Sequence, residues 1–295
     1  MGVNTLSQHT TYSRHPSWLK VRLPGGKGYG ETLQIARKQK LHTVCEDARC
    51  PNVAECWGRK TATFMILGDI CTRACAFCNV KSGRPTELDT DEPRRTAEAI
   101  SQLGIKHAVI TSVDRDDLPD GGAEAFAETV REVRRLSPTT TVEVLVPDFK
   151  GSLNALSKVW KAHPDVFGHN LETVPRLYSK VRCGHKYERS LKILADTKSL
   201  YPSIKTKTNI MLGHGETLEE VYEVMGDLVK IKLDGLTITQ YLQPSRDNLP
   251  VMKYYHPDEF VELRKVAIEK GIPFVQSGPL VRSSYRAEEV FKKNN

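Results

Sequence analysis

Six of the seven cysteines of this chain lie between residues 45 and 78, and their arrangement constrains what the chain can build. Three of them, Cys71, Cys75 and Cys78, lie in one loop after a short apolar run, spaced Cys-x3-Cys-x2-Cys. A closed structural zinc site takes four ligands, commonly in Cys-x2-Cys pairs far apart in sequence. Three thiolates on one loop instead suit a cubane iron–sulfur cluster, in which one iron then lacks a protein ligand. Structural cysteines at this spacing are the alternative.

The upstream cysteines, Cys45, Cys50 and Cys56, are spaced Cys-x4-Cys-x5-Cys. A disulfide framework is typical of a short secreted chain, whereas this chain has 295 residues and no signal-like apolar segment at its start. A strand-like run at 62–68 separates the two groups, which disfavours a single six-thiolate site. We therefore expect two clusters, each with three cysteines and a fourth position that is filled otherwise.

Composition narrows the class of protein. Hydrophobic residues make up 39% and charged residues 27% of the chain, as in a soluble globular enzyme. No apolar run approaches the roughly 20 residues that span a bilayer, so we expect no membrane partner. The net charge of +7 comes from dispersed basic residues without an RNA-binding motif, so we expect no nucleic-acid partner. Clustered free thiols favour a reducing cytoplasm, and a mildly basic surface would steer an acidic protein.

The remainder of the chain alternates short apolar runs with helical patterns. Such alternation predicts parallel strands joined by right-handed helical crossovers, either in a flat doubly wound sheet or in a barrel. The absence of a glycine-rich dinucleotide fingerprint argues against a Rossmann domain. The strands are expected at 63–67, 108–111, 142–146, 166–169, 206–211 and 236–240. The helices are expected at 93–103, 122–136, 152–163, 187–200, 217–231 and 257–270.

Three motifs carry a resemblance to a known family. The loop CTRACAFC resembles the signature of radical S-adenosylmethionine (radical SAM) enzymes. Together with CEDARCPNVAECW and the RSSY of residues 282–285, it resembles the lipoyl synthase family. The resemblance implies an α/β fold, a partial (β/α)6 TIM-like barrel whose mouth is closed by both chain ends. We expect an N-terminal extension over 1–58 with the upstream cysteines, the barrel over 59–275, and a C-terminal extension over 276–295.

The same resemblance implies two 4Fe-4S clusters. Cys71, Cys75 and Cys78 would hold the cluster whose open iron binds SAM. The upstream triplet would hold an auxiliary cluster, completed by a serine of RSSY. Adjacent residues in extended backbone point in opposite directions, so only one serine should reach the iron. We expect Ser284, with Ser283 as the alternative.

Five further residues are candidates for binding SAM. In the family an aromatic residue before the last cysteine lies beside the adenine, which here is Phe77. Asp114 follows the second expected strand, and Asn170 and Glu172 follow the fourth, where loops at the carboxyl ends of barrel strands carry the chemistry. Arg182 would pair with a carboxylate such as that of SAM. For Asp114 and Arg182 a solvated surface position is the alternative, and for Phe77 the alternative is a place in the core.

The chain departs from the family pattern at three positions. We expect proline and alanine around Gly184, where this chain has Cys183 and His185. His214 lies where an apolar residue is usual. The seventh cysteine, Cys183, is expected to be a small buried residue rather than a ligand.

The activity that the resemblance implies is that of a sulfurtransferase in lipoate biosynthesis. Two sulfur atoms would enter at C6 and C8 of an octanoyl chain on a lysine of an acidic lipoyl-carrier domain. One cluster would cleave SAM to a radical with an electron from a donor such as ferredoxin or flavodoxin, and the other would donate sulfide. No side-chain general base is required, so no catalytic side chain is assigned. The alternatives are a sulfur-inserting radical SAM enzyme of the biotin synthase or methylthiotransferase type, or a non-catalytic metal-binding module.

Overall fold

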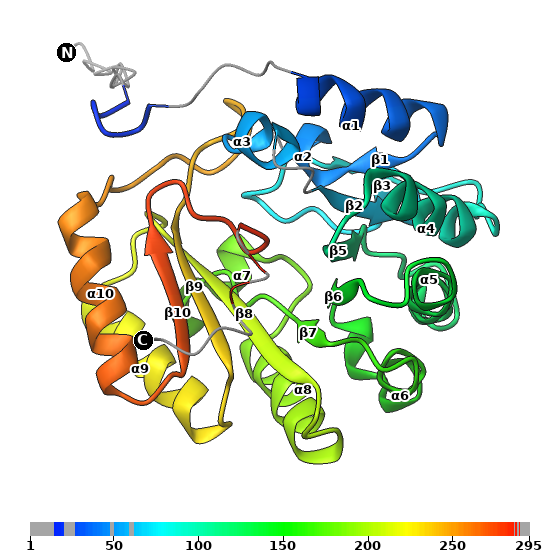
Figure 1. Ribbon diagram of the computed structural model, residues 1–295. Coiled ribbons are helices and arrows are strands. Elements are labelled where there is room, and N and C mark those ends of the chain that lie inside the picture. Colours follow the sequence, from blue (N-terminus) through cyan, green and yellow to red (C-terminus); the bar gives the residue numbers. More distant parts are fainter. Residues whose placement is uncertain are drawn as a thin grey trace, which may run out of the picture.

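Parallel strands form a curved, open sheet at the centre of the molecule (Figure 1). The computed structural model describes residues 15–20, 27–47, 50–58, 62–285, 287 and 289. In this part of the chain, eight strands pair in the order β1-β2-β5-β6-β7-β8-β9-β10, and only β1 is antiparallel to its neighbour. They are β1 (His42–Thr43), β2 (Thr63–Ile66), β5 (His107–Ser112), β6 (Thr141–Leu145), β7 (Val166–Gly168), β8 (Lys205–Leu212), β9 (Gly235–Gln240) and β10 (Phe274–Gly278).

Helices cover the outer, convex face of this sheet (Figure 1). Each of the six long helices connects one parallel strand to the next, which is the crossover that parallel strands require. Short helical segments, α7 (Tyr178–Val181), η1 (Phe149–Gly151) and η2 (Pro175–Leu177), follow β6 and β7. The long helices are α4 (Glu92–Leu103), α5 (Ala123–Leu136), α6 (Leu153–Lys161), α8 (Tyr187–Leu200), α9 (Leu218–Lys230) and α10 (Pro257–Glu269).

The six strands and six helices expected from the sequence are confirmed, as is the partial barrel. Strand β10 was not predicted, because its sequence FVQSG has only two apolar residues. It pairs in parallel with β9 along all five of its residues and spans the predicted boundary between 275 and 276. With β1, which was not predicted either, the sheet has two strands more than expected and still has two edges.

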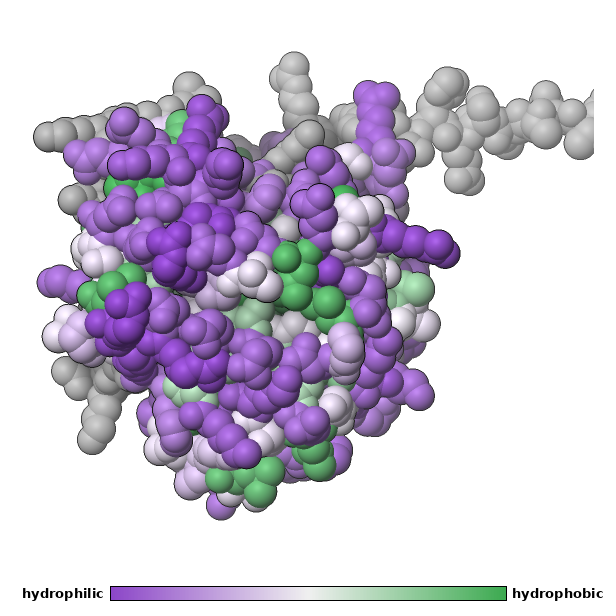
Figure 2. All heavy atoms as spheres, turned by 90° about the vertical axis from the view of Figure 1, so that its right-hand side faces the viewer, coloured by the Kyte–Doolittle hydropathy of each residue, from purple (hydrophilic) through white to green (hydrophobic). Residues whose placement is uncertain are grey.

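The side of the molecule formed by α4, α5 and α6 is mostly hydrophilic, with hydrophobic residues in small separate groups (Figure 2). Exposed ion pairs within one helix, such as Arg94 with Glu98 and Arg131 with Glu128, contribute to this surface. The apolar faces of these helices lie against the sheet. There Phe126 and Trp160 are buried, and Trp160 Nε1 donates to Thr197 Oγ1 at 2.9 Å.

Both ends of the described chain meet at the carboxyl ends of the strands. The N-terminal part forms α1 (Lys27–Lys38), α2 (Val44–Asp47) and α3 (Val53–Gly58), and the ring of Tyr29 stacks on that of Trp57 with centroids 5.0 Å apart. Asn52 Nδ2 donates to the Leu280 carbonyl at 2.6 Å, and the Tyr285 hydroxyl donates to Glu55 Oε1 at 2.9 Å. These contacts bring the upstream cysteines and the RSSY segment together.

Candidate metal and cofactor site

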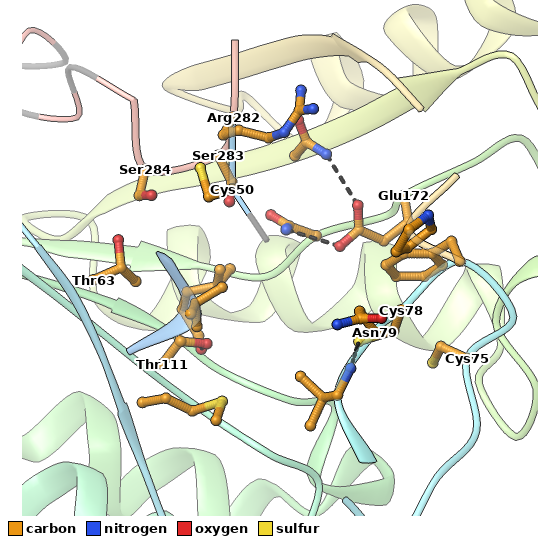
Figure 3. A pocket seen from close by; sticks show the side chains of 18 of the residues that line it. Cys50, Thr63, Cys75, Cys78, Asn79, Thr111, Glu172, Arg282, Ser283 and Ser284 are labelled. Atoms are coloured by element: carbon orange, nitrogen blue, oxygen red, sulfur yellow. Dashed lines mark hydrogen bonds between the residues drawn. The ribbon is translucent and has the colours of Figure 1, made fainter. Parts of the chain in front are cut away.

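A cavity of about 900 Å³ lies at the carboxyl ends of the strands and is lined by both cysteine groups and both serines. Figure 3 shows Cys50, Ser283, Ser284 and Arg282 on one side of it and Cys75 and Cys78 on the other. Residues from the barrel strands lie between these two sides, with Thr63 and Thr111 visible in the same view. Residues that are more than 200 positions apart in sequence thus share one cavity.

The downstream triplet lies on a loop that is anchored to the barrel. Its first cysteine ends β3 (Ile70–Cys71), which pairs with β4 (Lys81–Ser82). Backbone N–H groups of Arg73 and Asp114 donate to Cys71 Sγ at 3.4 and 3.3 Å, and that of Val80 donates to Cys78 Sγ at 3.4 Å. Such donors stabilise thiolate charge, and in iron–sulfur proteins they tune the reduction potential.

Burial keeps these thiols protonated in the metal-free chain. It raises the pKa of Cys75 to about 12, although the charge of Arg182 opposes the shift, and it raises the pKa of Cys78 to about 11. In the described residues no three His, Cys, Asp or Glu side chains converge on a point where one metal ion would sit. Three free thiols on one loop are the donor set that a cubane takes, since each would bind a different iron of the cluster.

The upstream triplet lies on the N-terminal extension. Cys45 lies in α2, Cys56 lies in α3, and Cys50 is between them. All three line a small second cavity together with Ser284, whereas Ser283 lines only the large one. Burial raises the pKa of Cys45 to about 11 and also raises that of Cys50, whose thiolate the charge of Arg282 favours.

The five residues expected to bind SAM all lie on the wall of the large cavity. Phe77 packs against the apolar cluster beneath α8, α9 and α10. Asp114 lies beside Cys71, where burial raises the pKa of its carboxyl and the charge of Arg73 opposes the rise. The remaining three form a hydrogen-bonded group.

Glu172 is the centre of that group (Figure 3). Its carboxylate accepts from Asn170 Nδ2 at 2.9 Å and from Asn209 Nδ2 at 3.0 Å. The Thr237 hydroxyl donates to Asn209 Oδ1 at 2.8 Å and so fixes which end of the amide faces Glu172. Burial raises the pKa of Glu172, and its φ of 69° lies in the left-handed region, so a strained backbone holds the carboxyl in place.

Arg182 has a buried donor that the described chain does not satisfy. One guanidinium nitrogen donates to the Asn170 carbonyl and, at 3.1 Å, to the Tyr178 hydroxyl. Nε is buried and has no partner among the described residues. That nitrogen is closed off from the cavity, but the guanidinium charge lies on the cavity wall, where it opposes the rise in the pKa of Cys75 and would attract a carboxylate. The wall therefore fits the carboxylate of an amino-acid cofactor such as SAM.

Asn209, Thr237, Arg73 and His185 were not assigned to the site from the sequence. Asn209 and Thr237 are polar residues inside buried strands, TKTNIML and GLTITQ, and that polarity was the available signal. Arg73 and His185 line the cavity and contact each other.

Cys183 was expected to be buried, and this expectation was wrong. Its side chain is exposed, because it lies in the turn after α7 and before Gly184, whose φ of 81° turns the chain back toward the barrel. His214 is buried, its ring stacks on that of Tyr241 with centroids 4.3 Å apart, and neither ring nitrogen has a partner in the described part of the chain.

An open barrel of parallel strands with a Cys-x3-Cys-x2-Cys loop at its mouth defines a radical SAM protein, and the model of the Radical SAM superfamily matches residues 65–228. Methylornithine synthase (PylB) has this fold, with a TM-score of 0.54 at 14% identity over 92% of this chain and 86% of that one. Streptococcus suis SuiB bound to S-adenosylmethionine gives a TM-score of 0.56 at 14% identity over 91% of this chain and 62% of that one.

The more specific match is in sequence. The model of the N-terminal domain of lipoyl synthase matches residues 3–50. Lipoyl synthase of Shouchella clausii is 55% identical over 94% of this chain and 90% of the relative, and that of Bacillus cereus (strain ATCC 14579) is 54% identical over 96% of both. This chain belongs to the lipoyl synthase family.

Proposed function

We propose that this chain inserts two sulfur atoms, at C6 and C8, into an octanoyl chain attached to a lysine of a lipoyl-carrier domain. The observation that carries the proposal is one cavity of about 900 Å³, which is lined by the whole downstream triplet and by Cys45 and Cys50 of the upstream one. Sulfur transfer to a carbon chain requires the activating site and the sulfur source to reach the same substrate. One shared cavity meets that requirement.

Each triplet has its own task in this proposal. Cys71, Cys75 and Cys78 hold the cluster that binds SAM, and the N–H donors around Cys71 stabilise its charge. The upstream cysteines hold the auxiliary cluster, and Ser284 completes its ligation in preference to Ser283, since Ser284 alone shares the small cavity with all three. The corresponding units are 1–58, 59–275 and 276–295.

The wall residues orient SAM. Arg182 attracts the carboxylate by its positive charge, while Glu172 and Asp114 accept from the amino group. Phe77 offers an aromatic face to the adenine. The pair of Asn170 and Asn209 holds the Glu172 carboxylate in one orientation, so that the ligand does not have to order it.

Apolar side chains provide a place for the alkyl chain. The cavity wall includes Met65, Val113, Leu145, Met211 and Leu242, which come from four strand ends and the loop after β9. An eight-carbon chain gains about 0.8 kcal/mol for each CH₂ that it buries in such surroundings. The same side chains exclude water from reactive species.

When bound, the clusters and SAM supply the hydrogen abstraction and the sulfur, chemistry that no side chain provides. The residues of this chain bind and orient the clusters, SAM and the substrate, and they shield these groups from water. No side chain acts as a general base, and none is assigned as catalytic.

The remaining proposals concern the protein partners and the cellular compartment. The net charge of +7 suits an acidic carrier domain, and a reductant such as ferredoxin or flavodoxin would supply electrons. The free thiols suit a reducing cytoplasm. Among the described helices none is long and apolar enough to cross a membrane, and we propose neither a membrane nor a nucleic-acid partner.

The test is anaerobic turnover by the cluster-loaded chain with an octanoylated carrier domain, SAM and a reductant. Mass spectrometry of the carrier should show the gain of two sulfur atoms, with SAM cleaved to deoxyadenosine. Cleavage of SAM without any gain of sulfur on the carrier would contradict the proposed substrate. Lack of SAM cleavage would contradict the proposed cofactor site.

A further inference from the structure

His185 lies in the loop between α7 and α8, where the lipoyl synthase pattern leads us to expect an alanine. Its side chain is 1% exposed and lies on the cavity wall with Asp114 and Arg182. The ring is therefore a buried part of the wall of the proposed SAM site. Its contacts indicate a role for it.

Arg73 contacts the ring directly. Arg73 Nη1 lies 2.9 Å from His185 Nδ1 and 3.2 Å from Nε2. A guanidinium has only donors, so a ring nitrogen must accept this hydrogen bond. Burial lowers the pKa of His185, and the charges of Arg182 and Arg73 act in the same direction, so the ring is neutral near pH 7 and has an accepting nitrogen.

Two carboxylates, those of Asp148 and Asp114, lie close to the ring nitrogens of His185. His185 Nδ1 is 3.3 Å from Asp148 Oδ2, and Nε2 is 3.8 Å from Asp114 Oδ2. The one N–H of a neutral ring therefore has a carboxylate within reach. Although burial raises the pKa of Asp148, hydrogen bonds from His185 and Arg73 hold it well below its usual range.

Arg73 and Asp114 belong to the immediate surroundings of the first thiolate. Arg73 is two residues after Cys71, and its guanidinium binds both carboxylate oxygens of Asp116 at 2.7 and 2.8 Å. The Asp114 N–H donates to Cys71 Sγ at 3.3 Å, and the Thr72 N–H donates to the Asp114 carbonyl at 2.9 Å. Through its contact with Arg73, the ring thus joins the α7–α8 loop to the thiolate loop.

We propose that His185 is a positioning residue, which through Arg73 and Asp148 fixes the thiolate loop relative to the wall that carries Arg182. The proposal rests on the proposed function, since it assumes that SAM binds between these two elements. Without the ring, Arg73 loses an acceptor and a gap opens between three loops. The Asp114 and Arg182 side chains would then no longer be held at the spacing that an amino-acid ligand requires.

The test is the affinity of the reduced, cluster-loaded chain for SAM in the absence of carrier substrate. The dissociation constant is read from the change that SAM causes in the electron paramagnetic resonance spectrum. His185→Ala should raise it by roughly tenfold, the size of effect that second-sphere residues have at metal sites. Far-ultraviolet circular dichroism should be unchanged.

Matched variants separate positioning from packing. His185→Gln keeps a donor and an acceptor and should bind SAM within about threefold of the wild type, whereas His185→Leu, of similar volume, should resemble the alanine variant. This pair is informative even if the alanine variant does not fold. Cys183→Ala, an exposed change in the same loop, should leave the affinity unchanged.

Two results would overturn the proposal: wild-type affinity in the leucine variant, or equal losses in the glutamine and leucine variants. The first would mean that the ring contributes nothing, and the second that hydrogen bonding is not its contribution. A wild-type chain whose spectrum does not respond to SAM would instead contradict the proposed cofactor site.

Discussion

The two cysteine groups face one cavity but are held in different ways. The downstream group lies on a loop that leaves β2, pairs through β3 and β4, and receives backbone hydrogen bonds at its sulfur atoms. The upstream group lies on α2, α3 and the turn between them; β1, directly before α2, pairs with β2, and contacts between the two chain ends, such as that of Asn52 with the Leu280 carbonyl, complete its surroundings. The barrel thus presets the downstream site, whereas the upstream site is completed only where the two chain ends meet.

This difference suits the two proposed tasks. A cluster that cycles electrons needs constant surroundings, which the barrel loop gives. A cluster that gives up sulfide must be opened and rebuilt, which an assembly of chain ends permits more readily. The predictions below test the two sites separately.

The largest effect should come from the barrel loop. Cys75→Ala removes one of three thiolates, so the proposed cluster is lost and SAM cleavage should fall below detection. Cys50→Ala should leave cleavage to deoxyadenosine within a few fold while sulfur insertion disappears. Both products are measured in one anaerobic assay. Lipoyl groups made by the Cys50 variant would show that the two sites do not divide the work in this way.

The next effect tests the meeting of the chain ends. Ser284→Ala should reduce sulfur insertion by at least about 100-fold, because a ligand to the auxiliary cluster is lost, and should spare SAM cleavage. Ser283→Ala is the matched control and should retain most sulfur insertion. If the two variants exchange these behaviours, the ligand is Ser283. The measurement is the mass of the carrier product.

A smaller effect, on SAM affinity, should follow when the hydrogen bonds that orient the Glu172 carboxylate are removed. Asn209→Leu leaves the carboxylate with one amide donor and should weaken SAM binding by roughly tenfold. Thr237→Val removes only the contact that orients the amide, so a loss of about threefold is expected. SAM titration by calorimetry measures both. Equal affinities in all three chains would remove Glu172 from the cofactor site.

The smallest expected effect is on the stability of the barrel, at His214 in the loop after β8. Burial lowers the pKa of His214 to about 4, from the 6.5 of a free side chain. A histidine whose pKa is depressed in the fold contributes stability that is complete above pH 6.5 and is lost as the pH falls toward 4. His214→Leu should remove this loss, so that near pH 4 the variant gains about 1 to 3 kcal/mol relative to the wild type. Thermal unfolding from pH 7 to 4 measures the difference, and parallel curves would contradict it.

The sequence was sufficient for elements whose signal is local. Strands such as β2 and β5 are apolar runs, and the helix patterns after them are long, so their places could be predicted. Strand β10 was missed because its last three residues, QSG, are not apolar. The cysteine spacing predicted two groups of donors, and their assignment as ligands stays a prediction.

Contacts between distant residues could not be predicted in this way. Arg73 and His185 are 112 positions apart, and nothing in either segment indicates that the guanidinium and the ring meet. The amide of Asn209 is oriented by Thr237 on the neighbouring strand, which depends on the register of β8 and β9. Cys183 was misplaced because a small thiol is usually buried, whereas here the turn at Gly184 leaves it outside.

The central claim is that two separate clusters face one cavity. The most direct test is the iron and sulfide content of three anaerobically reconstituted chains: the wild type, the chain with Cys45, Cys50 and Cys56 all changed to Ala, and the chain with Cys71, Cys75 and Cys78 all changed to Ala. The account predicts about eight irons per wild-type chain and about four in each variant. Four irons in the wild type, or the loss of all iron from either variant, would contradict it.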